Sequence, residues 1–202
     1  MIVSQSQSGN SHRTAGADAA PATHPVSRLG YVPEPVDDPI LDEMFARIRA
    51  SRGHLLNIHR VVGLAPKVLR AQASYARALR EESSLPRGLQ ELLILRVAQV
   101  NDSAYEQSVH RPIARDCGVS TEKLDALPSW SASLLFEPRE QVALRFVGQA
   151  ARSGEVDEDV FRALQEVFSP REIVELTALV GWYVGNSRFV RALQIAPEAA
   201  PD

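Results

Sequence analysis

The sequence predicts an all-α protein, a bundle of roughly seven to nine helices, and three observations lead to this prediction. Every long apolar segment of the 202-residue chain has helical spacing or helical length. No segment alternates apolar and polar residues in the way that is typical of a strand. Proline, serine or aspartate precedes most of the apolar segments, and glycine follows several of them, as expected at helix starts and ends.

One folded helical domain is expected over residues 28–196. Residues 1–27 are rich in Ser, Gln, Ala and Gly and almost lack large apolar side chains, so they are predicted to be a disordered leader. Residues 197–202 are predicted to be a frayed tail. Residues 28–39 contain three prolines and are expected to run extended over the folded body.

The first predicted helix runs from Pro39 to about Ser51, since its apolar residues fall on one face, and Gly53 ends it. A short helical turn is expected over residues 54–59. The next helix is predicted over residues 65–79, with one buried side and with its lysine and arginine side chains toward solvent.

The stretch from Leu85 to Gly118 is predicted to organise the chain. Its first helix opens at Pro86, which suits a first helical turn because its missing N–H would have no partner there. This helix is apolar on nearly every side, so it is expected to be buried in a core or an interface. The polar residues 101–103 then offer three capping side chains in a row, which predicts that a second helix starts there and packs antiparallel to the first.

These two helices carry the candidate site. Glu91 lies in the apolar helix, where a carboxylate must be paired, hydrogen-bonded or protonated. On the second helix Ser103, Glu106 and His110 fall within about 60° of one another at 100° per residue. If Glu91 faces that stripe, a carboxylate, an imidazole and a hydroxyl converge in one apolar pocket, which is a workable acid–base arrangement.

A structural interpretation of the same residues stays open. Glu91 could be the partner of Arg87 or Arg96, because charges at helical spacing often pair on one helix. His110 could be a packed, hydrogen-bonded residue without a chemical role. The residue types and their spacing do not separate these two interpretations.

Four more helices are predicted in the last part of the chain, over residues 120–128, 138–153, 157–168 and 169–195. Residues 170–176 repeat the Pro-Arg…Glu-Leu pattern of residues 86–92, 84 positions later. This repeat favours an internal duplication in which only the first copy keeps a Glu–His pair. The second copy would be scaffold, with Trp182 and Tyr183 among the residues of a pocket wall or interface. Chance agreement is the alternative.

Composition narrows the class of protein. A formal net charge of −3 and 45% apolar residues describe an ordinary soluble protein without a nucleic-acid or membrane partner. A single cysteine excludes an intramolecular disulfide and fits a reducing compartment. No apolar run has the length of a signal peptide or a membrane span, so a cytoplasmic location is expected by default. The His and Cys spacing matches no metal site, and neither a metal nor a cofactor is predicted.

Residues 86–120 read PRxxxELLILRVAxxxxxxYExxxHxxIAxxxGVS and resemble the core of the carboxymuconolactone decarboxylase family, which includes the alkyl hydroperoxidase D (AhpD) proteins. The resemblance covers roughly residues 38–196 and is sharpest over residues 85–122. In the peroxidase members the motif is a Glu, a CxxC pair and a His. Glu91 and His110 match the Glu and the His, while the two cysteine positions fall on Ser103 and Glu106.

The missing thiols bear on activity. Peroxide reduction needs a thiolate and a resolving thiol, and neither a hydroxyl nor a carboxylate can form a sulfenic acid. Cys117 has no second thiol in the chain, so a thiol peroxidase is not expected. The resemblance further implies an AhpD-like multi-helix bundle that forms dimers, trimers or hexamers. It also implies a pocket near residues 54–59, which makes His59 a candidate for substrate binding, with helix capping as the alternative.

Two functions follow. The first is a cofactor-independent lyase or isomerase similar to carboxymuconolactone decarboxylase, acting on a small keto or unsaturated carboxylic acid. His110 would be its general acid and base, with its pKa set by Glu91, and Glu106 would orient it or act as a second acid. Ser103 and Tyr105 would hydrogen-bond a carbonyl or enolate oxygen. The second function is a non-catalytic oligomer that binds a small ligand, and peroxidase activity through Cys117 ranks last.

Overall fold

The computed structural model describes residues 27–198. Within that range the chain forms nine α-helices, one 3-10 helix and no strand, which confirms the all-α prediction. Of the predicted leader only Ser27 is described, and its hydroxyl donates to the carbonyl oxygen of Gly30 at 2.6 Å. The elements are α1 (Pro39–Arg52), α2 (Asn57–Val62), α3 (Pro66–Arg80), α4 (Arg87–Val100), α5 (Ala104–Asp116), α6 (Thr121–Ala126), the 3-10 helix (Leu127–Ala132), α7 (Pro138–Ala150), α8 (Glu158–Val167) and α9 (Pro170–Leu193).

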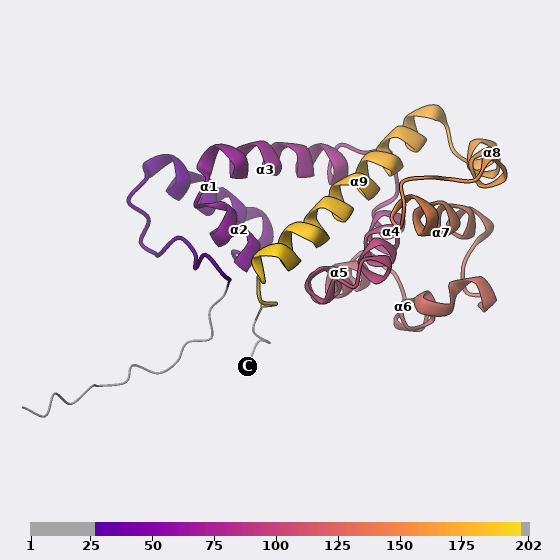
Figure 1. The fold of residues 1–202 in the computed structure, drawn as a ribbon, viewed down its shortest axis with the longest axis horizontal. Helices are drawn as coiled ribbons and strands as arrows, with labels where there is room; N and C mark the ends of the chain where they lie inside the picture. Colours follow the sequence, from indigo (N-terminus) through magenta and orange to yellow (C-terminus); the bar gives the residue numbers. More distant parts are fainter. Residues whose placement is uncertain (1–26, 199–202) are drawn as a thin grey trace, which may run out of the picture.

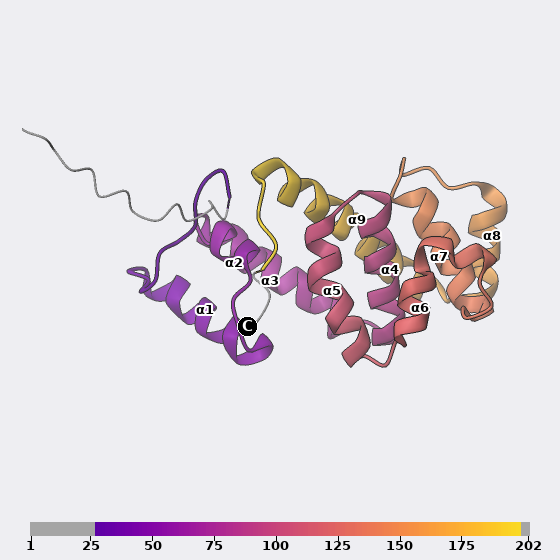
Figure 2. The ribbon, with the colours of Figure 1, turned by 90° about the horizontal axis from the view of Figure 1, so that it is seen from below.

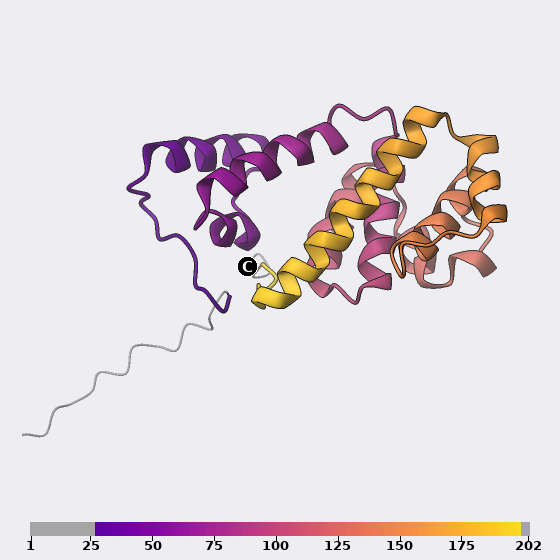
Figure 3. The same cartoon turned by 45° about the horizontal axis from the view of Figure 1, so that its top comes forward.

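The helices form two lobes. Helices α1 to α3 make an N-terminal lobe, helices α4 to α8 make a C-terminal lobe, and α9 runs diagonally from one to the other (Figure 1). Figure 3 shows the same division from another side. The N-terminal lobe has a small core of its own around Phe45, and the larger core lies among α4, α7, α8 and α9. None of the helices in the described part of the chain is long and apolar enough to cross a membrane.

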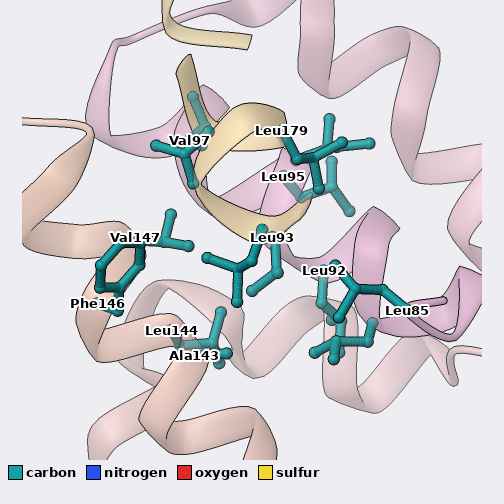
Figure 4. Close-up of a cluster of buried hydrophobic side chains, with 14 of the residues drawn as sticks. Leu85, Leu92, Leu93, Leu95, Val97, Ala143, Leu144, Phe146, Val147 and Leu179 are labelled. Carbon is teal, nitrogen blue, oxygen red and sulfur yellow. The ribbon is translucent and has the colours of Figure 1, made fainter. Parts of the chain in front are cut away.

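Helix α4 is the centre of the larger core. Nine of its fourteen residues are buried, which agrees with its nearly continuous apolar sequence. Leu93 has no exposed surface and lies beside Leu144 and Val147 of α7, with Leu179 of α9 nearby (Figure 4). Because α4 is covered by α5, α7 and α9 together, its side chains are held in fixed directions.

A tight turn joins α4 to α5. Asp102 has a positive φ of 51°, in the left-handed region that Asp tolerates better than most residues. Ser103 is then the N-cap of α5, and its hydroxyl oxygen accepts from the N–H of Glu106 at 3.4 Å. The turn reverses the chain, so α5 packs alongside α4 (Figure 2). This antiparallel pairing is what the sequence predicted, and it brings α5 residues level with the middle of α4.

Contacts near the C-terminus tie the lobes together. Tyr105 packs with Val61 of α2 and with Val190 of α9. The Glu198 carboxylate accepts from the Tyr105 hydroxyl at 3.0 Å and from the N–H of Asn57 at 2.8 Å. The first residues of the predicted tail therefore join α2 to α5.

The proposed repeat has a structural counterpart at its start only. Helices α4 and α9 each begin at the matched Pro-Arg, and each carries an ion pair four residues apart, Arg87–Glu91 and Arg171–Glu175, both at 2.8 Å. Helix α9 then continues through Ser187, whereas the first copy turns at the matched Ser103. Duplication therefore remains a hypothesis.

The core position of Leu93 gives a stability prediction. Leu93→Ala should lower the free energy of unfolding by about 2–5 kcal/mol, because it leaves a cavity between α4 and α7. Leu134→Ala is the matched control, since Leu134 is fully exposed and should change stability by less than about 0.5 kcal/mol. Urea unfolding measures both variants. Equal losses would contradict the assignment of α4 to the centre of the core.

Candidate acid–base site

The Glu91 carboxylate has no exposed surface, and two side chains bind it, one at each oxygen. Its Oε1 accepts from Arg87 Nη2 at 2.8 Å, one turn earlier on α4. Its Oε2 lies 2.6 Å from His110 Nδ1 on α5. The two partners considered from the sequence, the arginine and the histidine, thus bind the same carboxylate at once. This pairing offsets the cost of removing the charge from water.

The pairing fixes which ring nitrogen of His110 carries a proton. The Glu91 carboxylate accepts, so Nδ1 of His110 is the donor in this contact. In the neutral imidazole the second nitrogen, Nε2, is then the acceptor. Nε2 lies 3.5 Å from Oε2 of Glu106, one turn earlier on α5. His110 therefore stands between two carboxyl groups, with Nε2 available for proton transfer.

Glu106 lies in a different environment from Glu91. It is only 3% exposed, and its Oε1 has no hydrogen-bond partner among residues 27–198. Burial raises the pKa of this carboxyl, and the nearby charges of His110, Arg80 and Arg52 oppose that rise only in part. Glu106 therefore keeps its proton to a higher pH than an exposed carboxyl does, and it can serve as an acid beside His110.

Tyr183 completes the cluster from α9. Its ring meets the His110 ring edge to face, with the centroids 5.0 Å apart and the planes at 90°. Burial raises the pKa of the Tyr183 hydroxyl, so the hydroxyl stays protonated. The sequence placed Tyr183 in a pocket wall or interface through the repeat, and nothing in its local pattern indicated contact with His110.

The three other predicted site residues hydrogen-bond to groups other than the side chains of Glu91, Glu106 and His110. The Ser103 hydroxyl caps α5, as described above. The Tyr105 hydroxyl accepts from the N–H of Ile58 at 3.1 Å and donates to Glu198. Nδ1 of His59 accepts from the N–H of Leu56 at 3.1 Å and so caps α2. Burial, followed by the charges of Arg52 and Arg80, lowers the pKa of His59 to about 3, so this imidazole is neutral near pH 7.

Two surface pockets lie away from the cluster. One, of about 430 Å³, is lined by Pro86, Cys117, Lys123 and their neighbours. The other lies between the start of α5 and the end of α9, and it is lined by Ser103 and Tyr105 among others. Neither is lined by Glu91, Glu106 or His110. In the described part of the chain no three His, Cys, Asp or Glu side chains are grouped to hold a metal ion.

Comparisons with known proteins agree with the resemblance found in the sequence. Residues 66–149 match the model of the carboxymuconolactone decarboxylase family, which confirms the predicted resemblance. The uncharacterized protein YdfG of Bacillus subtilis strain 168 is 24% identical over 102 residues, which are 50% of this chain and 69% of YdfG.

Solved structures share the fold. An uncharacterized peroxidase-related protein of Ralstonia eutropha JMP134 with an alkylhydroperoxidase AhpD core superimposes with a TM-score of 0.75 at 21% identity, over 87% of this chain and 94% of that one. A cysteine-to-alanine variant of the debrominase Bmp8, in complex with 2,3,4-tribromopyrrole, gives a TM-score of 0.74 at 20% identity, over 84% and 91%. At these identities the likeness shows the AhpD fold alone.

The raised pKa of Glu106 predicts a pH dependence of stability. Between about pH 4.5 and its raised pKa, the folded chain holds a proton that the unfolded chain has released, so stability falls as the pH rises. Glu106→Gln removes this dependence. The stability of the variant relative to the wild type should therefore increase with pH in urea unfolding between about pH 4 and pH 8.

Glu166→Gln is the matched control for this experiment, because Glu166 is exposed on α8, away from the cluster. A stability of Glu106→Gln relative to the wild type that stays constant with pH, or that decreases as the pH rises, would contradict the burial of an acidic Glu106.

Proposed function

We propose that this protein is a cofactor-independent acid–base enzyme of the decarboxylase, lyase or isomerase type. Its substrate would be a small keto or unsaturated carboxylic acid. The observation that carries the proposal is the 2.6 Å contact between Glu91 and His110, with Oε2 of Glu106 3.5 Å from the other ring nitrogen. The match to the carboxymuconolactone decarboxylase family supports the same class of reaction.

Each member of the cluster has a role in such a reaction. Glu91 holds the proton on Nδ1 of His110 and balances the positive charge that forms when Nε2 takes up a second proton. Glu106 carries a proton that it can give to a guest molecule, because burial raises its pKa. Arg87 pairs with the Glu91 carboxylate, whereas burial raises the pKa of Glu106 and favours its protonated form.

In a decarboxylation, the bond between the carboxylate and the neighbouring carbon breaks and carbon dioxide leaves. The electron pair moves to a conjugated carbonyl and forms an enolate. Glu106 or His110 then gives a proton to the carbon, and water restores the proton to the protein. In an isomerisation, Nε2 of His110 removes a proton next to the carbonyl, and the same proton returns at another carbon of the conjugated system. Both reactions balance without an oxidant or a metal ion.

The thiol chemistry of the peroxidase members is not part of this proposal. Glu106 and Ser103 stand where those proteins have cysteines, and Cys117 caps the far end of α5. Seven residues of helix separate Cys117 from His110, which is about 10 Å along the axis. A lone thiol at that distance has neither a resolving partner nor contact with the cluster.

A ligand-binding protein without catalysis is the second candidate. It is favoured by the burial of the cluster, since Glu91, Glu106 and His110 are each at most 3% exposed and line neither surface pocket. We also propose that the protein is a homo-oligomer, because another copy would cover exposed apolar side chains such as Ile40, Val68 and Val174. A cytoplasmic location is part of the proposal as well, since a single cysteine fits a reducing compartment.

A substrate screen with a matched pair of histidine variants tests the proposal. Aromatic and dicarboxylic keto acids are offered to the wild type, to His110→Ala and to His54→Ala, whose histidine is exposed. Turnover should fall by about 10²–10⁴ in His110→Ala and stay unchanged in His54→Ala. Because His110 is buried, His110→Gln is measured as well, with circular dichroism as a check on folding.

Folded His110 variants that turn over the substrate as fast as the wild type would remove His110 from the mechanism. Saturable binding without turnover across the whole screen would favour the ligand-binding protein instead.

A further inference from the structure

The chain after α9 runs back toward the N-terminal lobe. Residues 195–198 form a C-terminal strap that has no regular secondary structure and lies between α2 and α5 (Figure 2). Its first residue, Ile195, is buried and packs with Val61 of α2, Tyr105 of α5 and Val190 of α9. The strap therefore lies where these three helices meet.

Few contacts hold the strap in place. Within the described part of the chain, every hydrogen bond to the strap beyond its first residue comes from Asn57 or Tyr105. Nδ2 of Asn57 donates to the carbonyl oxygens of Ala196 and Pro197, at 3.1 and 3.4 Å. The Glu198 carboxylate accepts from the Asn57 N–H at 2.8 Å and from the Tyr105 hydroxyl at 3.0 Å. A segment held in this way opens at a lower free energy than packed helices do, so the strap can open while the helices stay folded.

The strap also lines a pocket. This pocket, of about 380 Å³, lies between the start of α5 and the end of α9, and Pro197 of the strap lines it together with Ser103 and Tyr105. Val190 and Ile195 add apolar surface to its lining. Small-molecule sites combine an apolar lining with a few polar groups, and their volumes begin at about 300 Å³. The pocket thus has the size and the lining that suit a small organic molecule.

The same pocket borders the acid–base cluster of Glu91, Glu106 and His110. Ser103, which lines the pocket, is 1% exposed, and its hydroxyl oxygen accepts from the N–H of Glu106 at 3.4 Å. Oε1 of Glu106 is buried and has no hydrogen-bond partner in the described part of the chain, which leaves it able to bind a polar atom of a guest. Among the described residues, none that lines the pocket beside Cys117 hydrogen-bonds to a member of the cluster. Of the two pockets, the one under the strap is therefore the one that adjoins the cluster.

Tyr105 joins the strap to two helices. Burial, followed by the charge of Glu198, raises the pKa of the Tyr105 hydroxyl, so the hydroxyl stays protonated and keeps donating to Glu198. The same hydroxyl accepts from the N–H of Ile58 at 3.1 Å, at the start of α2. Without the Glu198 carboxylate, the strap would lose its bond to this side chain of α5 and its bond to the Asn57 N–H of α2 together.

We propose that this pocket is the route by which a substrate reaches the cluster, and that the C-terminal strap is the cover of the route. Glu198 holds the cover closed by binding Tyr105 and Asn57 at once. The strap opens to admit the guest, and its return excludes water from Glu106 and His110, which strengthens their interactions with the guest. The inference rests on the proposed function for the identity of the guest, a small keto or unsaturated carboxylic acid.

Chemical modification of His110 measures access to the cluster without a substrate. Diethyl pyrocarbonate acylates the unprotonated nitrogen of an imidazole that it can reach. Peptide mass spectrometry gives the rate at His110, and N-acetylhistidine in the same solution is the reference. Glu198→Ala in the full chain removes the carboxylate that holds the strap. The rate at His110 relative to the reference should then be about 10-fold above the wild-type value, since two hydrogen bonds that oppose opening are lost.

Glu140→Ala is the matched control. Oε2 of Glu140 also accepts from two groups, Nζ of Lys123 at 2.9 Å and the N–H of Glu137 at 2.8 Å, but Glu140 lies on α7 and does not line the pocket under the strap. The relative rate at His110 in this variant should stay within about twofold of the wild-type value. Asn57→Ala, which removes the side-chain bonds to two carbonyl oxygens of the strap, takes the place of Glu198→Ala if that variant does not fold.

A relative rate at His110 that does not rise in the strap variant, or that rises equally in Glu140→Ala, would overturn this inference. Because no turnover is measured, either result would leave the proposed function standing. If the substrate screen instead shows no turnover that depends on His110, the proposed function fails, and faster acylation in the strap variant alone still identifies the route to the cluster.

Discussion

The rest of the structure depends on the burial of one charge. Glu91 has no exposed surface, so its carboxylate must be compensated by the protein, and Arg87 and His110 do this from two helices. The compensation requires α5 to reverse tightly against α4, which the left-handed Asp102 and the Ser103 cap make possible. The contact between Glu91 and His110 thus sets both the register of α4 against α5 and the residues that meet in the site.

The two carboxyl groups beside His110 differ because their surroundings differ. Glu91 has a hydrogen-bond partner on each oxygen, whereas Glu106 has one oxygen without any partner among residues 27–198 and a pKa raised by burial. Glu106 stands at a cysteine position of the peroxidase motif, and its carboxyl cannot form a sulfenic acid.

Much of this could be predicted from the sequence, because the relevant signals are local. Local signals locate α4, α5 and the turn between them: Pro86, the apolar run after it and the polar residues at 101–103. Helical spacing then places Glu91 opposite His110. The place of Tyr183 could not be predicted in this way, since α9 is far along the chain and its rotation is set by packing on α4. The hydrogen bonds of Ser103 and Tyr105 could not be predicted from the sequence either. The Ser103 hydroxyl caps α5, and the Tyr105 hydroxyl donates to Glu198.

The protonation of the His110 ring tests the central claim most directly, and it requires no substrate. In protein carrying isotope-labelled histidine, long-range proton–nitrogen correlation spectra distinguish the two ring nitrogens, and His110→Gln identifies the signals of His110. The account predicts a proton on Nδ1, held by Glu91, and an Nε2 that is unprotonated when the ring is neutral. A neutral ring with its proton on Nε2 would contradict it, because Glu91 would then have no donor from His110.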